Sequence, residues 1–425
     1  MLTIKLLRED KERVIQKLKI KNFDAETIIN KIIEIDEAKR TVQNKLEQSL
    51  SELNNISKQV GILFKDGKVE EANKAKEKTV ELKNETKDLN SELNKLDSDL
   101  NNLIVQLPNL PNELVPIGKG AEDNEIIKTG GKIPELLESN SLPHWDLAKK
   151  YDIIDFELGN KITGAGFPVY KGKGAKLQRA LISYFLDRAI ENGYDEVMPP
   201  LLVNEASGFG TGQLPDKEGQ MYHAGIDNFY LIPTAEVPVT NIFRDEIVQA
   251  EDFPIKKTAY TPCFRREAGS YGKDVRGLNR LHQFDKVEIV HISHPEVSYK
   301  ALDEMVNHVE NLVKELELPY RILRLCGGDM SFTSALTYDF EVFSAAQKKW
   351  LEVSSVSNFE EFQANRLKLR FKEKGDKKTK LAHTLNGSAL ALPRIVAALL
   401  ENNQTPDGIK IPKILVPYTG FEYIN

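Results

Sequence analysis

Cysteine is nearly absent from this 425-residue sequence, which contains only Cys263 and Cys326. Two cysteines cannot build a disulfide framework or a four-thiolate zinc site, so neither is expected. Long apolar runs are also lacking, and none reaches the ~18–20 residues that cross a bilayer. The N-terminal stretch MLTIKLLREDKERV is charged throughout and does not resemble a signal peptide. We therefore expect a cytoplasmic protein that has no membrane partner.

The common nucleotide-binding loops are missing as well. There is no GxxxxGK[ST] phosphate loop and no strand–GxGxxG–helix unit, since Gly164–Gly166 and Gly172–Gly174 are too short. The seven histidines are scattered and form neither an HExxH motif nor a zinc-ligand cluster. The net charge of −6 gives no argument for nucleic-acid binding from bulk basicity, although local patches can still meet phosphate. A bound nucleotide would need a different kind of site.

The sequence does contain a long heptad pattern near its N-terminus. A short helical segment is expected over residues 1–26, and apolar residues then recur in alternating steps of three and four. The first seam, interrupted only by a lysine and a serine, is Ile28, Ile32, Ile35, Lys39, Val42, Leu46, Ser49, Leu53, Ile56, Val60 and Leu63. The second seam is Ala72, Ala75, Thr79, Leu82, Thr86, Leu89, Leu93, Leu96, Leu100 and Leu103. A turn signal at 61–67 separates them, which predicts an antiparallel coiled-coil hairpin with arms roughly 50–55 Å long.

This hairpin has two interpretations. The commoner use of a coiled-coil hairpin in proteins is as a spacer or a dimerisation rod. Its charge distribution favours a polyanion at the tip, because residues 58–87 carry eight Lys and Arg against six Asp and Glu, whereas the base (31–57 and 88–103) carries five against nine. We assign an N-terminal domain to residues 1–107, with the arm at about 27–103.

The rest of the chain is expected to be an α+β domain. Residues 108–143 are rich in Pro and Gly and are interpreted as a linker to a domain at 144–425. Helices are expected at 175–192, 235–247, 296–317, 358–365 and 392–402. Strands are expected at 228–232, 256–264, 281–291, 320–325, 337–343, 350–356 and 379–385. Because two of these strands are joined by a hairpin, we expect a mainly antiparallel sheet flanked by helices.

The stretch from Thr258 to His291 concentrates charged side chains at strand ends. The first strand ends in FRRE (264–267), and the second carries HQFDKVE (282–288). The loop between them contains Gly269, Gly272, Gly277, Lys273, Arg276 and Arg280. Such a hairpin points arginines and a carboxylate toward one spot beneath a basic loop, which suits a polyphosphate. The alternatives are an ordinary ion pair between Arg265 and Glu267, and a solvated position for Glu288.

Three further clusters carry polar side chains. Thr234-Ala235-Glu236 opens a helix, and it fits a capping motif as well as a binding site. The run 352–355 (EVSS), with Asp339 and Glu341 before it, could hold a hard cation such as Mg²⁺ when phosphate is near. Arg394 lies at the start of a helix, where the macrodipole disfavours a cation, so a ligand explains it better.

Together these motifs resemble those of the bacterial-type seryl-tRNA synthetases, a family of class II aminoacyl-tRNA synthetases. The resemblance covers almost the whole chain, and the order and spacing of the motifs make it specific. Residues 193–200 (GYDEVMPP) look like motif 1, residues 264–270 with 282–288 like motif 2, and the segment ending in 392–394 (LPR) like motif 3. The seryl branch is indicated by residues 210–215 (GTGQLP), 233–238 (PTAEVP), 352–355 (EVSS) and 384–388 (TLNGS).

The resemblance implies a class II catalytic domain that forms a homodimer through the motif 1 region. It implies that serine and ATP, with Mg²⁺, give seryl-adenylate. Serine would then pass to tRNA(Ser), held by the N-terminal arm, and to tRNA(Sec) where that RNA is present. No zinc is expected, since the cysteine that a zinc-dependent branch would need is not at hand.

The resemblance also implies roles for individual residues. The catalytic residues would be Arg265, on the α-phosphate and the serine carboxylate, Glu267, on the adenine amino group, and Arg394, on the γ-phosphate and over adenine opposite Phe284. Serine would be bound by Thr234, Ala235, Glu236, Arg265, Glu288, Thr384, Asn386 and Ser388. ATP would be bound by Arg265, Arg266, Glu267, Arg280, Phe284, Glu352, Val353, Ser354, Ser355 and Arg394. Glu352 and Ser355 would ligate Mg²⁺.

Some positions depart from the family pattern. A Trp-Leu-Pro run commonly follows the acidic strand, where this chain has Phe343-Ser344-Ala345, and Asn365 stands where an arginine is frequent. Two other functions stay open beside serine–tRNA ligation. One is a paralogue that activates an amino acid without charging tRNA, against which the intact arm argues. The other is a non-catalytic coiled-coil protein, which is disfavoured by the joint presence of Arg265, Glu267, Glu288, Glu352 and Arg394.

Overall fold

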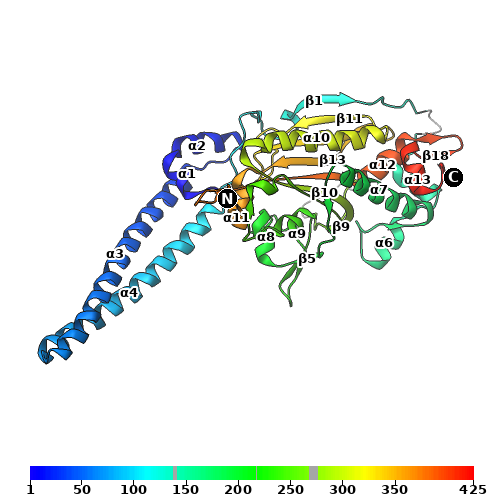
Figure 1. Ribbon diagram of the computed structural model, residues 1–425. Helices are drawn as coiled ribbons and strands as arrows, with labels where there is room; N and C mark the ends of the chain where they lie inside the picture. The colour runs from blue at the N-terminus through cyan, green and yellow to red at the C-terminus, as the bar shows by residue number, and fades with distance from the viewer. Residues whose placement is uncertain (137–140, 217, 268–275) are drawn as a thin grey trace. The chain divides into compact units, whose positions relative to one another are not determined.

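The computed structural model describes residues 1–136, 141–216, 218–267 and 276–425 (Figure 1). These residues form two compact units. The first comprises Met1–Lys19 and Phe23–Pro108, and the second comprises Ile20–Asn22 and Asn109–Asn425. None of the helices in the described ranges combines the length and apolar character that a membrane span requires.

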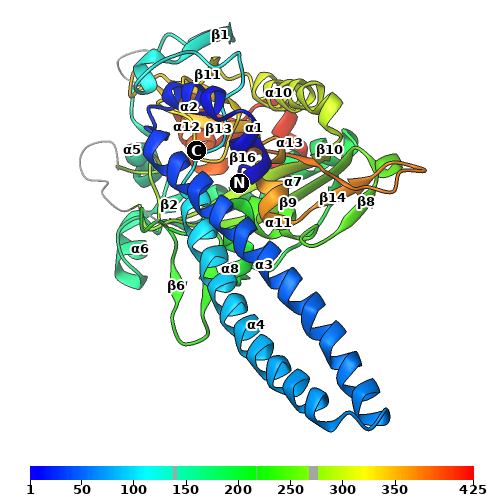
Figure 2. The same ribbon diagram turned by 90° about the vertical axis from the view of Figure 1, so that its left-hand side faces the viewer.

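The first unit contains the predicted helical hairpin. Its helices are α1 (Ile4–Glu9), α2 (Lys11–Ile20), α3 (Glu26–Lys65) and α4 (Val69–Ile104). The two long helices run side by side in opposite directions (Figures 1 and 2). The residues of both predicted seams are buried or partly buried. Lys39, which interrupts the first seam, forms an ion pair with Asp97 of the facing helix, Nζ to Oδ1 2.5 Å. The coiled-coil hairpin is therefore confirmed, although α3 continues through Gly61 and the turn lies at Asp66–Lys68.

The second unit is built on an eight-stranded sheet with the strand order β1-β11-β12-β13-β16-β10-β9-β4. The strands are β1 (Glu125–Gly130), β11 (Tyr320–Arg324), β12 (Leu336–Ser344), β13 (Lys349–Asn358), β16 (His383–Ala391), β10 (Gln283–Ser293), β9 (Ile255–Phe264) and β4 (Asp195–Glu196). All neighbours pair antiparallel except β4 and β9. The mainly antiparallel sheet is confirmed.

Helices complete the second unit. They are α5 (His144–Lys150), α6 (Phe156–Ile162), α7 (Gly172–Glu191), α8 (Glu205–Thr211), α9 (Glu236–Asn241), α10 (Ser298–Glu315), α11 (Glu361–Leu367), α12 (Leu392–Asn402) and α13 (Val416–Thr419). Smaller strands are β2 (Ile154–Asp155), β3 (Val169–Tyr170), β5 (Leu202–Val203), β6 (His223–Ala224), β7 (Phe229–Leu231), β8 (Ile247–Gln249), β14 (Arg370–Lys372), β15 (Lys380–Leu381), β17 (Gln404–Thr405), β18 (Gly408–Lys410) and β19 (Tyr423–Ile424).

The two faces of the sheet have different environments. On β10, Val287 and Ile289 belong to the main core, into which α7, α10 and α12 also pack apolar side chains. Val290 and Ile292 belong to a second cluster together with residues of α9, α11 and β14. Since side chains alternate along a strand, Glu288 shares the second face with Val290. This face carries the candidate site.

Several predictions about local structure were wrong, among them the helix expected at 235–247, which ends at Asn241. The strand expected at 379–385 is two strands, β15 and β16, and residues 384–388 (TLNGS) lie inside β16. Leu385 and Ala389 of β16 pack in the main core, so its small polar residues fill the alternate positions of a strand. The linker expected at 108–143 contains β1, which pairs with β11 at the edge of the sheet.

Candidate active site

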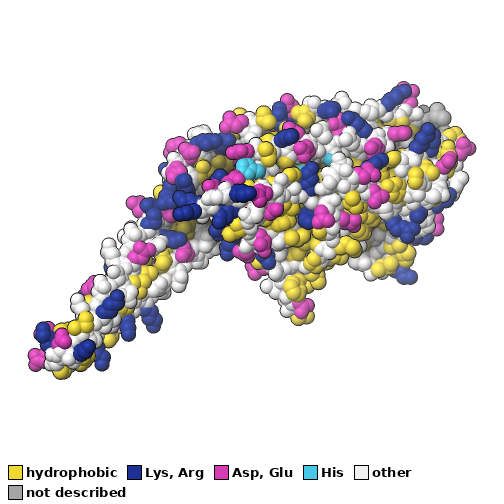
Figure 3. Space-filling model, viewed as in Figure 1, with side chains coloured by type: hydrophobic (Ala, Val, Ile, Leu, Met, Phe, Trp, Pro, Cys, Tyr) yellow, Lys and Arg dark blue, Asp and Glu magenta, His cyan; other side chains and the backbone are white. Residues whose placement is uncertain are grey.

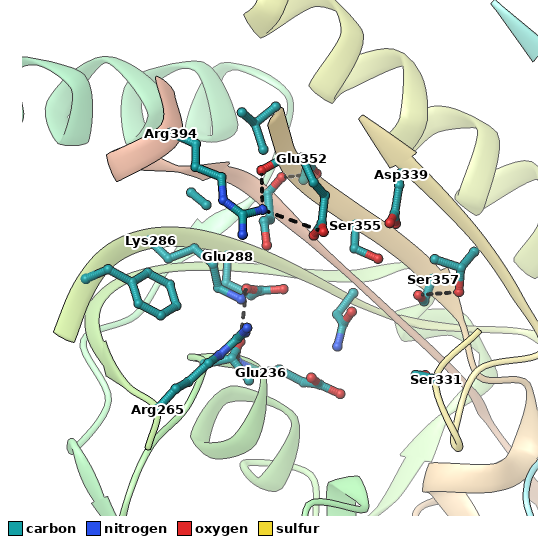
Figure 4. Close-up of a pocket in the computed structure, with 18 of the residues that line it drawn as sticks. Glu236, Arg265, Lys286, Glu288, Ser331, Asp339, Glu352, Ser355, Ser357 and Arg394 are labelled. Atoms are coloured by element: carbon teal, nitrogen blue, oxygen red, sulfur yellow. Dashed lines mark hydrogen bonds and ion pairs between the residues drawn. The ribbon is translucent and has the colours of Figure 1, made fainter. Parts of the chain in front are cut away.

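A cavity of about 590 Å³ lies over the strands β10, β13 and β16, between the ends of β9 and the start of α12. Figure 4 shows Arg265, Lys286 and Glu288 in one part of it and Glu352, Ser355 and Asp339 in another. The register explains this convergence, because Glu288 on β10 faces Ser388 on β16. The cavity therefore joins side chains from segments that lie far apart in the sequence.

One end of the cavity holds two buried carboxylates. Glu288 accepts a hydrogen bond from the Thr234 hydroxyl at 3.1 Å and forms an ion pair with Lys286, Nζ to Oε2 2.6 Å. Both side chains of this pair are buried, at 7% and 3% exposure. Burial raises the pKa of Glu236 to about 7, and the charge of Glu288 adds to the rise. This end is built to meet a cation and a hydroxyl group.

Two successive hydrogen bonds through Gln363, which does not line the cavity, fix the Glu236 side chain. Its Oε1 accepts from Gln363 Nε2 at 2.7 Å, and Gln363 Oε1 accepts from the Thr384 hydroxyl at 2.7 Å. Thr384 therefore acts through Gln363, and it does not line the cavity, whereas Asn386 and Ser388 do. The Asn386 Nδ2 atom is buried with no partner at ordinary hydrogen-bond distance among the described residues, and Asn386 is near enough to Glu236 to act to lower the pKa of that carboxyl. A substrate oxygen in this pocket would therefore be within its reach.

Cations and an aromatic ring lie nearer the other end. The Arg265 guanidinium lies 5.2 Å from the Phe284 ring centroid, and its Nε donates to the Pro233 carbonyl at 3.3 Å. Glu267, whose φ is +49°, forms an ion pair with Arg280. Arg394 donates from Nη1 to the Glu352 carbonyl oxygen at 2.7 Å and lies 3.6 Å from the Glu352 carboxylate. These groups suit an aromatic base and a polyanion.

A set of oxygen atoms beside them fits a hard cation. Asp339 pairs with Ser355 across β12 and β13, and its Oδ1 is buried with no hydrogen-bond partner in the described residues. Burial raises the pKa of Asp339 well above its usual range, and the nearby Glu352 adds to the rise. No group of three or more His, Cys, Asp or Glu in the described part of the chain could hold a metal ion by itself. The residues therefore fit Mg²⁺ only when substrate oxygens and water complete the ligand set.

Most of the residues predicted from the sequence line this one cavity. They are Thr234, Glu236, Arg265, Glu267, Arg280, Phe284, Glu288, Glu352, Val353, Ser354, Ser355, Asn386, Ser388 and Arg394. Ala235, Arg266 and Thr384 do not line it. Gly269, Gly272 and Lys273 of the predicted basic loop lie outside the described residues.

Sequence reasoning missed several residues of the cavity wall. Lys286 has a signal that could have found it, because Phe284, Lys286 and Glu288 lie two residues apart and so share one face of β10. Gln213 also lines the cavity and belongs to the motif at 210–215, although no role was predicted for it. Asn279 lines the cavity too, but it comes from an irregular segment without a hydrophobic period that could identify it. Gln363 lies behind the wall on α11, and only the three-dimensional contact with Glu236 identifies it.

Known proteins resemble the chain over its full length. A family model of the seryl-tRNA synthetase N-terminal domain matches residues 1–111, and one of the class II tRNA synthetase core domain (G, H, P, S and T) matches residues 222–403. A serine–tRNA ligase of Salinibacter ruber is 51% identical over 100% of this chain and 99% of its own length.

Two solved structures are similar as well. A seryl-tRNA synthetase from Pyrococcus horikoshii complexed with ATP has a TM-score of 0.92 and 34% identity, over 99% of each chain. A cytoplasmic serine–tRNA ligase from Naegleria fowleri in complex with AMP has a TM-score of 0.88 and 25% identity, over 100% of this chain and 99% of its own.

Proposed function

This chain belongs to the seryl-tRNA synthetases, class II enzymes that act as serine–tRNA ligases, and on that premise we propose how it performs the reaction. It activates serine with ATP to seryl-adenylate and then transfers serine to tRNA(Ser), and also to tRNA(Sec) where that RNA is present. The observation that carries the proposal is the cavity in which two buried acids, Glu236 and Glu288, lie beside Arg265. A zwitterionic amino acid next to a phosphate needs this combination of charges.

The serine pocket is the end with the two acids. Glu236 and Glu288 take the ammonium group and the hydroxyl, and Thr234, Asn386 and Ser388 supply further hydrogen bonds. A site with fixed partners for a hydroxyl rejects the analogue that lacks it by about 10⁴-fold, so alanine is excluded strongly. Threonine is excluded only because the pocket lacks room for its extra methyl group, and this steric exclusion discriminates less strongly.

The nucleotide occupies the end with the arginines. Adenine lies between Phe284 and Arg394, with its amino group on Glu267, and Arg280 and Arg394 hold the γ-phosphate. Arg265 lies between the serine carboxylate and the α-phosphate, whose mutual repulsion would otherwise oppose attack. Val353 and Ser354, on β13, complete the proposed nucleotide site, and Arg266, between Arg265 and Glu267, is proposed to adjoin it.

The first step needs no general base. The serine carboxylate is already ionised, so its oxygen attacks the α-phosphorus, and the bond to the pyrophosphate oxygen breaks. The arginines stabilise the negative charge that develops as pyrophosphate leaves. Glu352 and Ser355, with Asp339 beside them, would hold Mg²⁺, which when bound shields the phosphate charge.

The helical hairpin is the proposed tRNA-binding arm of a domain at 1–107, and the proposed catalytic domain is built on the sheet that begins with β1. Its tip, residues 58–87, carries the excess of basic side chains, and Ile62 and Phe64 there are 59% and 46% exposed. Backbone and shape contacts dominate the recognition of structured RNA, which suits a rigid rod. The match of residues 1–111 to the seryl-tRNA synthetase N-terminal domain and the basic tip support this role over that of a spacer or a dimerisation rod.

We further propose a homodimer that forms through the motif 1 region. Hydrophobic side chains gather along one edge of the face seen in Figure 3. Met198, within residues 193–200, is 89% exposed, and Leu202 is 47% exposed. Large apolar side chains exposed in one region mark an interaction surface.

Two assays test the function. Serine-dependent ATP–pyrophosphate exchange separates the ligase and the paralogue from a non-catalytic protein, and Arg265→Ala should abolish it. Charging of tRNA(Ser), measured with the full chain and without residues 27–103, separates the ligase from the paralogue. We expect the deletion to spare exchange and abolish charging, and unchanged charging would refute the role of the arm. Charging of tRNA(Sec) in the same assay tests the second RNA.

A further inference from the structure

A buried set of hydrogen bonds joins Glu401 on α12 to the nucleotide end of the cavity. The Glu401 side chain is fully buried and accepts from His144 Nδ1 at 2.7 Å, from Gln347 Nε2 at 2.9 Å and from the Ser344 hydroxyl. Burial acts to raise the pKa of Glu401, but the hydrogen bonds from His144 and Ser344 outweigh it and lower the pKa. Glu401 is therefore a carboxylate that only accepts hydrogen bonds, and every group around it must donate.

This requirement fixes the orientation of two neighbours. His144 must carry its proton on Nδ1, and its Nε2 is then free to accept from the Leu278 backbone N–H at 2.8 Å. Gln347 must present its NH₂ group to Glu401, so its carbonyl oxygen Oε1 points the other way. That oxygen accepts from Asn279 Nδ2 at 2.9 Å.

The last member of the set is left with an unused acceptor. Since Asn279 donates its NH₂ group to Gln347, its Oδ1 cannot exchange places with Nδ2. Asn279 is only 6% exposed, and Oδ1 is buried with no hydrogen-bond partner among the described residues. Asn279 lines the cavity, and its backbone carbonyl accepts from Arg394 Nε at 3.0 Å. A buried acceptor without a partner is costly, so the free protein carries a polar group prepared for a ligand.

We infer that Asn279 is a nucleotide-binding residue whose Oδ1 accepts a hydrogen bond from a donor group of bound ATP. The inference rests on the proposed function, which puts ATP at this end of the cavity. The phosphates and ring nitrogens of ATP only accept hydrogen bonds, so the donor is either a ribose hydroxyl or the adenine amino group. Glu401, Gln347 and Ser344 are positioning residues that hold the amide in this orientation. Ser344 belongs to the segment that departs from the family's common Trp-Leu-Pro run, and it has a positioning role here.

The packing of the loop supports a fixed position for this amide. Gly277, two residues before Asn279, has a φ of +68°, and a Cβ atom there would lie 2.2 Å from His144 Nε2. A side chain at this position would displace the imidazole that accepts from Leu278. His144 therefore holds the loop at Gly277 and Leu278, and Arg394 of α12 holds it at the Asn279 carbonyl.

Asn279→Leu tests the inference, because it removes the acceptor and nearly conserves the volume. In pyrophosphate exchange we expect the KM for ATP to rise about three- to tenfold, as for one lost hydrogen bond, with the KM for serine unchanged. Three analogues identify the donor: 2′-deoxy-ATP, 3′-deoxy-ATP and purine riboside triphosphate, which lacks the amino group. With one of them, wild type and variant should have equal KM values, since the contact is already missing.

Two further variants complete the test. Asn279→Ser, which also withdraws the acceptor, is measured if the leucine variant does not fold. Asn403→Leu is the matched control, since that half-buried amide donates to the Leu399 carbonyl at 3.0 Å and does not line the cavity. It should leave both KM values unchanged.

The outcomes separate cleanly. An unchanged KM for ATP in Asn279→Leu overturns the inference, and means that water alone meets Oδ1. A rise of equal size with ATP and with all three analogues also overturns it, because a general disturbance of the cavity acts on every nucleotide. Absence of serine-dependent exchange in the wild type would overturn the proposed function instead.

Discussion

The buried ion pair between Lys286 and Glu288 allows a quantitative prediction. Its two side chains are 7% and 3% exposed, and Nζ and Oε2 are 2.6 Å apart. Removing one partner of a buried pair costs about 3–5 kcal/mol, because the other charge remains buried without compensation. Glu288→Gln keeps the shape and an amide oxygen near the lysine. We therefore expect a loss near the lower end, about 3 kcal/mol of the free energy of unfolding.

The double variant should be more stable than either single variant. Lys286→Met leaves Glu288 next to Glu236, so it should also cost about 3 kcal/mol. When both charges are removed, no uncompensated charge remains, and we expect a total loss of at most about 2 kcal/mol. The double-mutant cycle would then give a coupling energy of about 4 kcal/mol.

Urea unfolding followed by tryptophan fluorescence measures this cycle. The only tryptophans, Trp145 and Trp350, both lie in the second unit, so the signal reports the unit that contains the pair. The matched control is the exposed pair of Lys374 and Glu251, with 3.6 Å between Nζ and Oε1 and side chains that are 90% and 65% exposed. Its cycle should show no measurable coupling. Additive losses at Lys286 and Glu288 would refute the reasoning.

Three other predictions follow from the site and its surface. Because burial and Glu288 raise the pKa of Glu236 to about 7, the free enzyme protonates this carboxyl below pH 7, and the serine ammonium must displace that proton. The KM for serine should therefore rise as the pH falls below 7, and Glu236→Gln should remove this dependence in exchange assays. Ser355→Ala should raise the Mg²⁺ concentration for half-maximal exchange severalfold, and an unchanged requirement would exclude Ser355 as a ligand. Met198→Glu should shift the sedimentation coefficient from dimer to monomer, and an intact dimer would place the interface elsewhere.

The sequence allowed the larger elements and much of the cavity wall to be predicted for physical reasons. Heptad spacing depends only on residue type and position, so α3 and α4 could be predicted directly. The hairpin of β9 and β10 could be predicted from its apolar runs, and it brings Arg265 and Glu288 to one cavity as expected. In β16, by contrast, glycine, serine and asparagine favour turns, and only burial between two strands overrides that preference.

Side-chain orientation was the part that sequence could not supply. The acceptor of Asn279 is defined by Glu401, more than a hundred residues later in the chain, through Gln347. A hydrogen-bond relay of this kind has no period and no fixed spacing. It becomes visible only when donors and acceptors can be assigned one after another.

The strand β10 shows why stability and chemistry are linked in this site. Its odd-numbered residues Val287 and Ile289 pack in the main core, whereas Lys286 and Glu288 face the cavity. A register shift of one residue would exchange the two sets and put both charges into the core. Val287 and Ile289 therefore hold the strand in the register that directs the Lys286 and Glu288 side chains into the cavity. Removing one charge of this pair should therefore cost the fold more than removing both, which is what the double-mutant cycle measures.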